Sequence, residues 1–200
     1  MQRNTRKNGR AKIIIFCKKI KNILKYYLNK KRIFILRLRG ANIGYNVTIG
    51  SGVQIENAFN FLVEDNVYIG KNFYANCIGN VEIRKGAIIS DNCAIMSFNH
   101  DYSDKYIFPY GLKDRYKPVI ICERSWIGYN VNISPGTVVG KYSIIGMGST
   151  AFGHIPDGVI FAGGKIIKER KSGDLVHAKW DLLEVRNIVD PINYIYFKWV

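Results

Sequence analysis

The residue best suited to catalysis in this 200-residue chain is His100, which stands directly before a long irregular stretch. Histidine is the side chain whose ordinary pKa suits proton transfer near neutral pH, so it is a natural general base. A lone histidine is more often a surface or structural residue, so the position of His100 in the fold must decide whether it can act as a base. His154 and His177 lie in an irregular turn and a terminal extension and are not candidates.

Other catalytic signatures do not compete with this histidine. The sequence has no G-x-S-x-G nucleophile motif, no P-loop lysine motif and no His/Cys cluster with metal-ligand spacing. We therefore predict no metal site. The four cysteines are scattered without a C-x-x-C pair, which predicts reduced and mostly buried thiols. They are Cys17, Cys77, Cys93 and Cys122.

The sequence contains a six-residue repeat, and the fold that this repeat forms must position any such base. An aliphatic residue leads each unit and is often followed by glycine, as in Ile43-Gly44, Ile69-Gly70 and Ile127-Gly128. The leading positions are 43, 49, 55; 63, 69, 75; 83, 89, 95; 121, 127, 133; and 139, 145, 151. The step is six within each triplet, and insertions occur only after a third unit.

This phase predicts a triangular prism with three short strands per coil, five coils and an all-β core. Ile and Val at the leading positions suit a buried, pleated surface. Gly and Asn suit corners that need a positive φ. An antiparallel β-sandwich would instead show alternation broken by irregular hairpin turns. The sequence therefore favours a parallel β-helix.

The phase also places His100 at the last position of its unit, at the corner where an insertion over residues 101–120 begins. A long loop in a compact repeat is usually functional or disordered. We expect the imidazole to face outward into a cleft roofed by this loop. This placement favours His100 as the catalytic base.

The basic charge of the chain is concentrated at its N-terminus. Residues 1–39 hold 14 of the 30 Lys and Arg residues and no acid, which leaves 16 basic against 15 acidic residues. A basic amphipathic helix is expected over about residues 11–29. Its apolar residues at helical spacing are Phe16, Ile20, Ile23, Leu24, Tyr27 and Leu28.

Two roles for this helix remain open and are compatible. It could cap the first coil, with a solvated basic face, or contact an anionic membrane through residues 1–39; nucleic acid is not expected. The apolar run over residues 13–17 is too short for a span of roughly 20 residues, and no cleavage site follows it. We expect a cytoplasmic chain, peripheral at the inner face of the membrane if the helix binds there.

The C-terminus is expected to form a helix followed by an aromatic tail over residues 174–200. Terminal repeats need caps, so this extension would cover the last coil or contact another subunit. The predicted organisation is a basic segment over 1–40, a β-helix domain over 41–170 and an extension over 171–200.

Over roughly residues 40–170 the chain resembles the hexapeptide-repeat acyltransferases. This group includes maltose and galactoside O-acetyltransferases, surface-polysaccharide O-acetyltransferases and streptogramin-type xenobiotic acetyltransferases. The matching motifs are Asn99-His100-Asp101-Tyr102, Lys117-Pro118-Val119-Ile120-Ile121, Ser125-Trp126-Ile127-Gly128, Ile133-Ser134-Pro135-Gly136 and Ile155-Pro156-Asp157-Gly158. The resemblance implies a left-handed coil, against the usual right-handed preference for crossovers.

The resemblance also implies a homotrimer that uses acetyl-CoA as cosubstrate, bound in clefts between neighbouring prisms. His100 would take the proton from an acceptor hydroxyl, whose oxygen attacks the thioester directly. Backbone N–H groups would stabilise the oxyanion.

Further site residues follow from the same resemblance. Asn76, within the matching run Tyr74-Ala75-Asn76, would line the acetyl and acceptor site, and Asp101 is assigned there with Tyr74. Trp126 would wall the same cleft, or it would be a corner residue that packs on a neighbouring coil.

The cofactor side of the site is matched by four residues. Tyr129 and Met147 occupy positions along the CoA chain, and Lys165 and Lys168 match basic residues near the nucleotide phosphates. The family's Ala-Gly-Asn-Pro-Ala-Lys is shortened here by two residues to Ala-Gly-Gly-Lys at 162–165. The repeat after Asn76 is also short, so an acidic acceptor ligand expected there is predicted to be missing.

These observations favour an O-acetyltransferase acting on a sugar hydroxyl of a bacterial surface polysaccharide or its lipid-linked precursor. The basic leader suits precursors held at an anionic membrane. A xenobiotic acetyltransferase is an alternative, because the aromatic-proline-aromatic run at 106–110 loosely resembles that group. N-acetylation of an amino-sugar nucleotide is another. A non-enzymatic scaffold fits least, because His100 and Asn76 keep their motif context.

Overall fold

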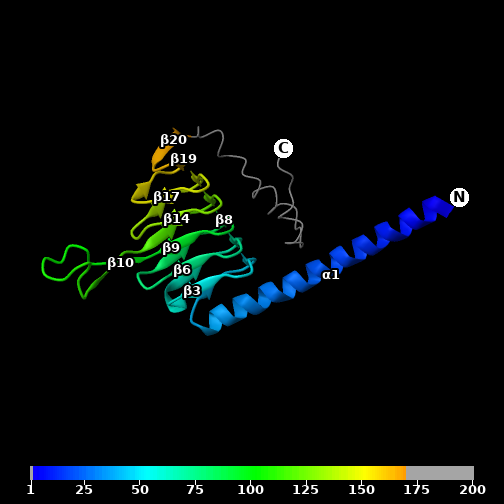
Figure 1. Cartoon of the computed structure of the whole chain (residues 1–200), viewed down its shortest axis with the longest axis horizontal. Coiled ribbons are helices and arrows are strands. Elements are labelled where there is room, and N and C mark those ends of the chain that lie inside the picture. Colours follow the sequence, from blue (N-terminus) through cyan, green and yellow to red (C-terminus); the bar gives the residue numbers. More distant parts are fainter. Residues whose placement is uncertain (1, 170–200) are drawn as a thin grey trace.

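The computed structural model describes the backbone of residues 2–169 and the side chains of residues 16–169. The prediction for residues 174–200 lies outside this range. The described chain forms a parallel β-helix with one long N-terminal helix and one projecting hairpin (Figure 1). The expected all-β core is confirmed.

Three sheets form the sides of the prism. Sheet 1 contains β1 (Asn42–Ile43), β4 (Phe61–Val63), β7 (Val81–Ile83), β12 (Val119–Ile121), β15 (Val138–Val139) and β18 (His154–Ile155). Sheet 2 contains β2 (Thr48–Ile49), β5 (Tyr68–Ile69), β8 (Ile88–Ile89), β13 (Trp126–Ile127), β16 (Ile144–Ile145), β19 (Val159–Ala162) and β20 (Lys165–Glu169). Sheet 3 contains β3 (Gln54–Glu56), β6 (Tyr74–Asn76), β9 (Ala94–Met96), β14 (Asn132–Ile133) and β17 (Thr150–Ala151). A short 3₁₀ turn, η1 (Ala58–Asn60), follows β3.

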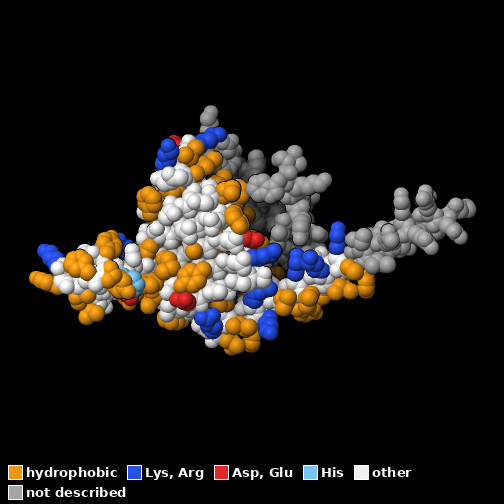
Figure 2. All heavy atoms as spheres, in the orientation of Figure 1, with side chains coloured by type: hydrophobic (Ala, Val, Ile, Leu, Met, Phe, Trp, Pro, Cys, Tyr) orange, Lys and Arg blue, Asp and Glu red, His pale blue; other side chains and the backbone are white. Residues whose placement is uncertain are grey.

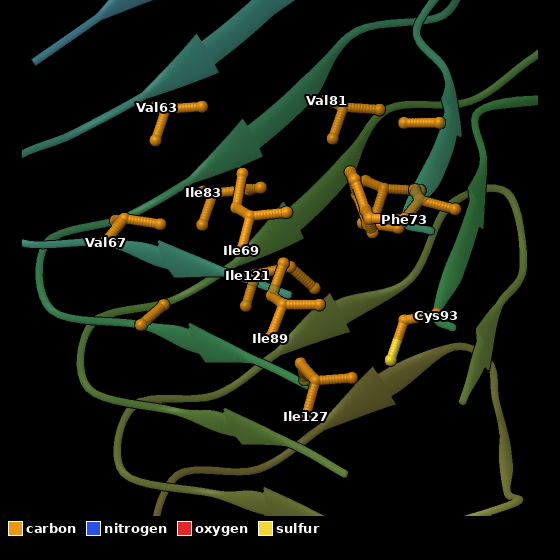
Figure 3. Packing of buried hydrophobic residues seen from close by; sticks show 14 of the residues in the cluster. Val63, Val67, Ile69, Phe73, Val81, Ile83, Ile89, Cys93, Ile121 and Ile127 are labelled. Carbon is orange, nitrogen blue, oxygen red and sulfur yellow. The ribbon is translucent and has the colours of Figure 1, made fainter. Parts of the chain in front are cut away.

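All fifteen leading positions of the hexapeptides are buried, which confirms the repeat phase. Figure 3 shows how they stack coil on coil, with Ile69, Ile89 and Ile127 from sheet 2 in one column. Two strands of a sixth coil, β18 and β19, add Ile155 and Phe161 to the core. The sequence count stopped at five coils because the step from position 151 to 155 is four.

The corners are built as the repeat predicted. Asn46, Asn66, Asn72 and Asn92 all have φ between 52° and 61°, the left-handed region that Asn tolerates better than most residues. Their side chains also bond from coil to coil: the amide nitrogen of Asn46 donates to Asn66 at 2.8 Å, and that of Asn72 to Asn92 at 3.0 Å.

The N-terminal helix α1 runs from Gln2 to Leu38 and extends past the predicted 11–29 at both ends. It caps the first coil, but through its last turns. Ile33 and Leu36 are buried, and the Asn29 side chain bonds the carbonyl oxygen of Val47 and the N–H of Ile49.

The predicted apolar stripe does not make this cap. Its residues at positions 16–28 are exposed, because α1 ends beneath the first coil and its earlier turns project beyond the prism (Figure 1). No helix among the described residues is both long and apolar enough to cross a membrane.

Three arginines at the end of α1 complete the hydrogen bonding of the first coil. In later coils the carbonyl of each leading residue accepts a bond from the preceding coil, as Val63 and Ile69 do from Gly44 and Gly50. The first coil has no predecessor, and buried carbonyls without partners are costly. The bonds are Arg37 to Ile43 (2.6 Å), Arg32 to Ile49 (2.7 Å) and Arg39 to Ile55 (2.7 Å).

We therefore predict that Arg32→Ala lowers the free energy of unfolding by about 1–3 kcal/mol, because the Ile49 carbonyl loses a charge-assisted partner. Lys31→Ala is the matched control on the exposed side of the same turn and should change it by less than about 0.5 kcal/mol. Urea denaturation measures both. Equal effects of the two substitutions would show that the arginine cap contributes nothing.

Candidate active site

The insertion forms a projecting arm. Strands β10 (Phe98–His100) and β11 (Asp114–Tyr116) pair antiparallel and carry a loop over residues 101–113. The arm leaves the third coil after Ser97, and the chain returns where the Lys117 N–H donates to the Ser97 carbonyl at 2.9 Å. The arm points away from its own prism (Figure 1), and a cleft roofed by its loop stays a prediction. Within residues 2–169 its two strands pair only with each other.

The arm holds His100 in a defined orientation. Its Nδ1 lies 2.8 Å from Oδ1 of Asp114, and its ring stacks on Tyr110 with centroids 4.1 Å apart and planes inclined by 13°. Just under half of the His100 side chain is exposed. When a neutral imidazole donates Nδ1–H to a carboxylate, Nε2 carries the lone pair and becomes the base.

Asp114 was missed by the sequence reasoning. It stands fourteen residues after His100, and the pairing of the two follows from the register of the hairpin, which sets Asp114 directly opposite. Residues opposite each other in an antiparallel pair have Cβ atoms about 4.5–5.5 Å apart. A hairpin register could have found it; the hexapeptide phase could not.

Asp101 is engaged by its own loop. Its carboxylate accepts bonds from the backbone N–H and hydroxyl of Ser103 and pairs with Arg115 at 2.7 Å. The Ser103 bonds, with the Arg115 charge, lower the pKa of Asp101. These contacts order the start of the loop next to His100.

Asn76 lies one coil before the base of the arm, and its amide is held in one orientation. Its Nδ2 donates to Glu56 at 2.7 Å, and its Oδ1 accepts from Asn57 Nδ2 at 3.0 Å and from the Ile78 N–H at 3.2 Å. The Ser97 hydroxyl donates to the Asn76 carbonyl at 2.7 Å. The amide also hydrogen-bonds the Tyr74 side chain, so its polar atoms are engaged within the protein.

Glu56 supplies an acid beside Asn76 from the preceding coil. The sequence predicted that an acidic ligand after Asn76 would be missing, and it could not show that a residue twenty positions earlier lies alongside. Burial is the main cause that raises the pKa of Tyr74, and the neighbouring Glu56 raises it further. The same two causes raise the pKa of Cys77 to about 12. Both groups are therefore neutral near pH 7.

The remaining predicted residues lie elsewhere on the prism. Trp126 on β13 in sheet 2 is half-buried, and its Nε1 donates to the Ser90 hydroxyl at 3.2 Å. Tyr129 and Met147 are exposed at the corner between sheets 2 and 3, in neighbouring coils. The Tyr129 hydroxyl accepts a 2.6 Å bond from Asn92.

Lys165 and Lys168 are exposed on β20, which pairs antiparallel with β19 at the end of the prism. The shortened segment between these strands is a two-residue hairpin turn in which Gly163 and Gly164 have φ of 57° and 81°. Such turns need positive φ at both central residues, so two glycines fit.

One chain does not bring these residues to a single place. Asn76 and His100 belong to sheet 3 and the corner after it, whereas Trp126 lies on sheet 2 and Tyr129 at the corner before sheet 3. The structure thus divides the predicted residues into two groups.

Comparison with known proteins identifies relatives of this chain. No family model matches the chain. WcaF of Escherichia coli (strain K12), named for acetyl transfer in colanic acid biosynthesis, is 28% identical over 145 residues, covering 72% of this chain and 77% of WcaF. WbbJ of the same strain, named for O-acetyl transfer in lipopolysaccharide biosynthesis, is 31% identical over 140 residues, covering 64% and 71%.

Among solved structures, a hexapeptide-repeat acetyltransferase from Vibrio cholerae matches with a TM-score of 0.66 and 20% identity, over 74% of this chain and 84% of that one. The fold is a left-handed parallel β-helix, as the resemblance implied. The chain belongs to the hexapeptide-repeat acetyltransferases. It is an acyltransferase, and acetyl-CoA is its cosubstrate.

For the site, we predict that Asp114→Asn lowers kcat by about tenfold or more without changing the KM for acetyl-CoA, because the amide no longer holds His100 in the tautomer with a basic Nε2. Asp104→Asn makes the same chemical change elsewhere on the same arm and should have little effect. Steady-state kinetics compare the two; equal activities would remove Asp114 from any positioning role.

We further predict that Glu56→Ala lowers kcat on the order of tenfold, because the Asn76 amide nitrogen loses its carboxylate acceptor and the amide is held less firmly. Gln54→Ala changes an exposed neighbour on β3 and serves as the control. If both variants keep wild-type kcat, the orientation of Asn76 does not matter for transfer.

Proposed function

We propose that this protein transfers an acetyl group from acetyl-CoA to a sugar hydroxyl of a bacterial surface polysaccharide or its lipid-linked precursor, with His100 as the general base. The observation that carries the proposal is the His100–Asp114 pair on the exposed arm of an acetyltransferase fold. The names of WcaF and WbbJ, which refer to colanic acid and lipopolysaccharide, support the glycan acceptor.

The geometry suits direct transfer. With Asp114 accepting Nδ1–H, Nε2 of His100 takes the proton of the acceptor hydroxyl while that oxygen bonds to the thioester carbonyl carbon. The C–S bond then breaks, and the imidazolium returns its proton to the departing CoA thiolate. A positioned general base typically contributes about 10²–10⁴-fold.

Asn76 and Tyr74 form the acceptor side of this proposed site. Hydrogen bonds of Glu56 with Asn76 and with Tyr74 join these three side chains. Asp101 keeps the arm ordered through Ser103 and Arg115. Trp126, Tyr129 and Met147 would line the acetyl and CoA chain. Lys165 and Lys168 would act as point charges toward the nucleotide phosphates.

A homotrimer would join the two groups. The arm leads away from its own prism and ends in exposed apolar side chains, among them Tyr106 and Leu112 at 92% and 90% exposed. Such side chains in a projecting loop are suited to a partner surface. In a cyclic trimer the arm of one chain would meet the sheet 2 side of the next, which carries Trp126.

The proposed organisation keeps residues 41–170 as the transferase domain, with 1–40 as a basic segment and 171–200 as an extension. The basic segment would contact an anionic membrane, and the enzyme would then lie in the cytoplasm, peripheral to the inner face. The Lys and Arg residues of the segment support this contact, since each is worth roughly 1 kcal/mol near an anionic surface.

The test is His100→Ala. We expect acetyl transfer to fall by about 10²–10⁴-fold because the general base is lost, while acetyl-CoA binding is unchanged. His154→Ala, an exposed histidine on β18, is the matched control and should keep wild-type activity. Acceptor glycans come from cells that lack the protein, and mass spectrometry detects the acetyl group. Full transfer by His100→Ala, or no acetyl-CoA binding by the wild type, contradicts the proposal.

A further inference from the structure

One face of helix α1 packs against the β-helix. Asn29, Ile33 and Leu36 contact or cover the first coil. At 3.6 residues per turn these three positions fall within an arc of about 60°. They define the capping face of α1.

The opposite face of α1 is apolar and exposed. Projected on the same helical wheel, its large apolar residues share an arc of about 140° whose centre lies opposite the capping face. These residues, the outer stripe, are Phe16, Ile20, Ile23, Leu24, Tyr27, Leu28, Phe34, Ile35 and Leu38. Figure 2 shows hydrophobic side chains along the edge of the helix that is turned away from the prism, at the bottom of the view.

The charges along the helix fit one occupant of this stripe. Lys19 and Lys30 project at one margin of the arc and Lys21 at the other, while Lys31 lies within it on a long flexible stem. Residues 16–39 include no acid. A second α1 packed on the stripe would bring like charges together, whereas anionic headgroups neutralise them.

We infer that the outer stripe lies in the interface of an anionic membrane and that the first-coil end of the β-helix faces that membrane. The arm with His100 leaves the third coil, two coil spacings or about 10 Å from the first. If the proposed sugar transfer holds, this orientation makes the acceptor a lipid-linked glycan that extends from the bilayer past α1 to the arm. A cyclic trimer would present three stripes to the same surface, which multiplies the attachment.

The first experiment sediments the full chain with vesicles of phosphatidylcholine alone or mixed with phosphatidylglycerol. We expect binding to the mixed vesicles that weakens with salt. The double variant Ile20→Gln/Leu24→Gln should bind at least about tenfold less, with an unchanged melting temperature. The control Tyr26→Gln changes an exposed aromatic side chain of the same helix that lies outside the arc of the stripe, and it should bind as the wild type does.

The second experiment uses Cys17, which is exposed and lies within the arc of the stripe. Cys77 and Cys93 are buried, and the partly exposed Cys122 is replaced by serine before labelling. An environment-sensitive fluorophore on Cys17 should shift to shorter wavelength on the mixed vesicles. No shift, no vesicle binding, or equal losses in Ile20→Gln/Leu24→Gln and Tyr26→Gln would overturn the inference. So would a change of oligomer size in Ile20→Gln/Leu24→Gln, because the stripe would then be covered by a second copy.

The two proposals fail separately. His100→Ala should bind the mixed vesicles as the wild type does. Vesicle binding without acetyl transfer would overturn the proposed function alone, and transfer to a glycan without vesicle binding would overturn the lipid-facing stripe alone.

Discussion

The structure depends on hydrogen bonds between successive coils. Its strands are two to five residues long, so none is stable without the strands before and after it in the stack. The hydrogen bonds repeat in register because each coil returns to the same phase. The same register stacks the leading aliphatic residues on one another in the core. The same regularity leaves an open edge at the first coil, which Asn29 and three arginines of α1 close.

This cap changes how the basic leader is interpreted. Counted along the sequence, its charges point to an anionic partner, yet Arg32, Arg37 and Arg39 bond backbone carbonyls of the first coil. The capping residues follow the predicted stripe, so one helix carries two separate faces. Residues 29–39 alone cap the first coil, which leaves the earlier turns of α1 available for contact with a surface.

The prism also explains why the proposed chemistry is carried on an arm. Every inward position is needed for the core and every strand is paired within a sheet, so new geometry can be added only at a corner. The inserted hairpin brings its own carboxylate, Asp114, opposite His100. On the prism itself, Asn76 gains its partner from the preceding coil, where Glu56 lies in register.

The sequence by itself determined the repeat phase, the fifteen inward positions, the corner that carries the insertion and the place of His100 at its start. These follow from local spacing, because a hexapeptide carries its own strand and corner. The tertiary structure alone decided the partners: Asp114 for His100, Glu56 for Asn76, and the first-coil carbonyls for the α1 arginines. It also revealed the sixth coil and the division of the predicted site between two sides of the prism. Such contacts join residues fourteen or more positions apart in most cases, and only the register of the hairpin and the coils brings them together.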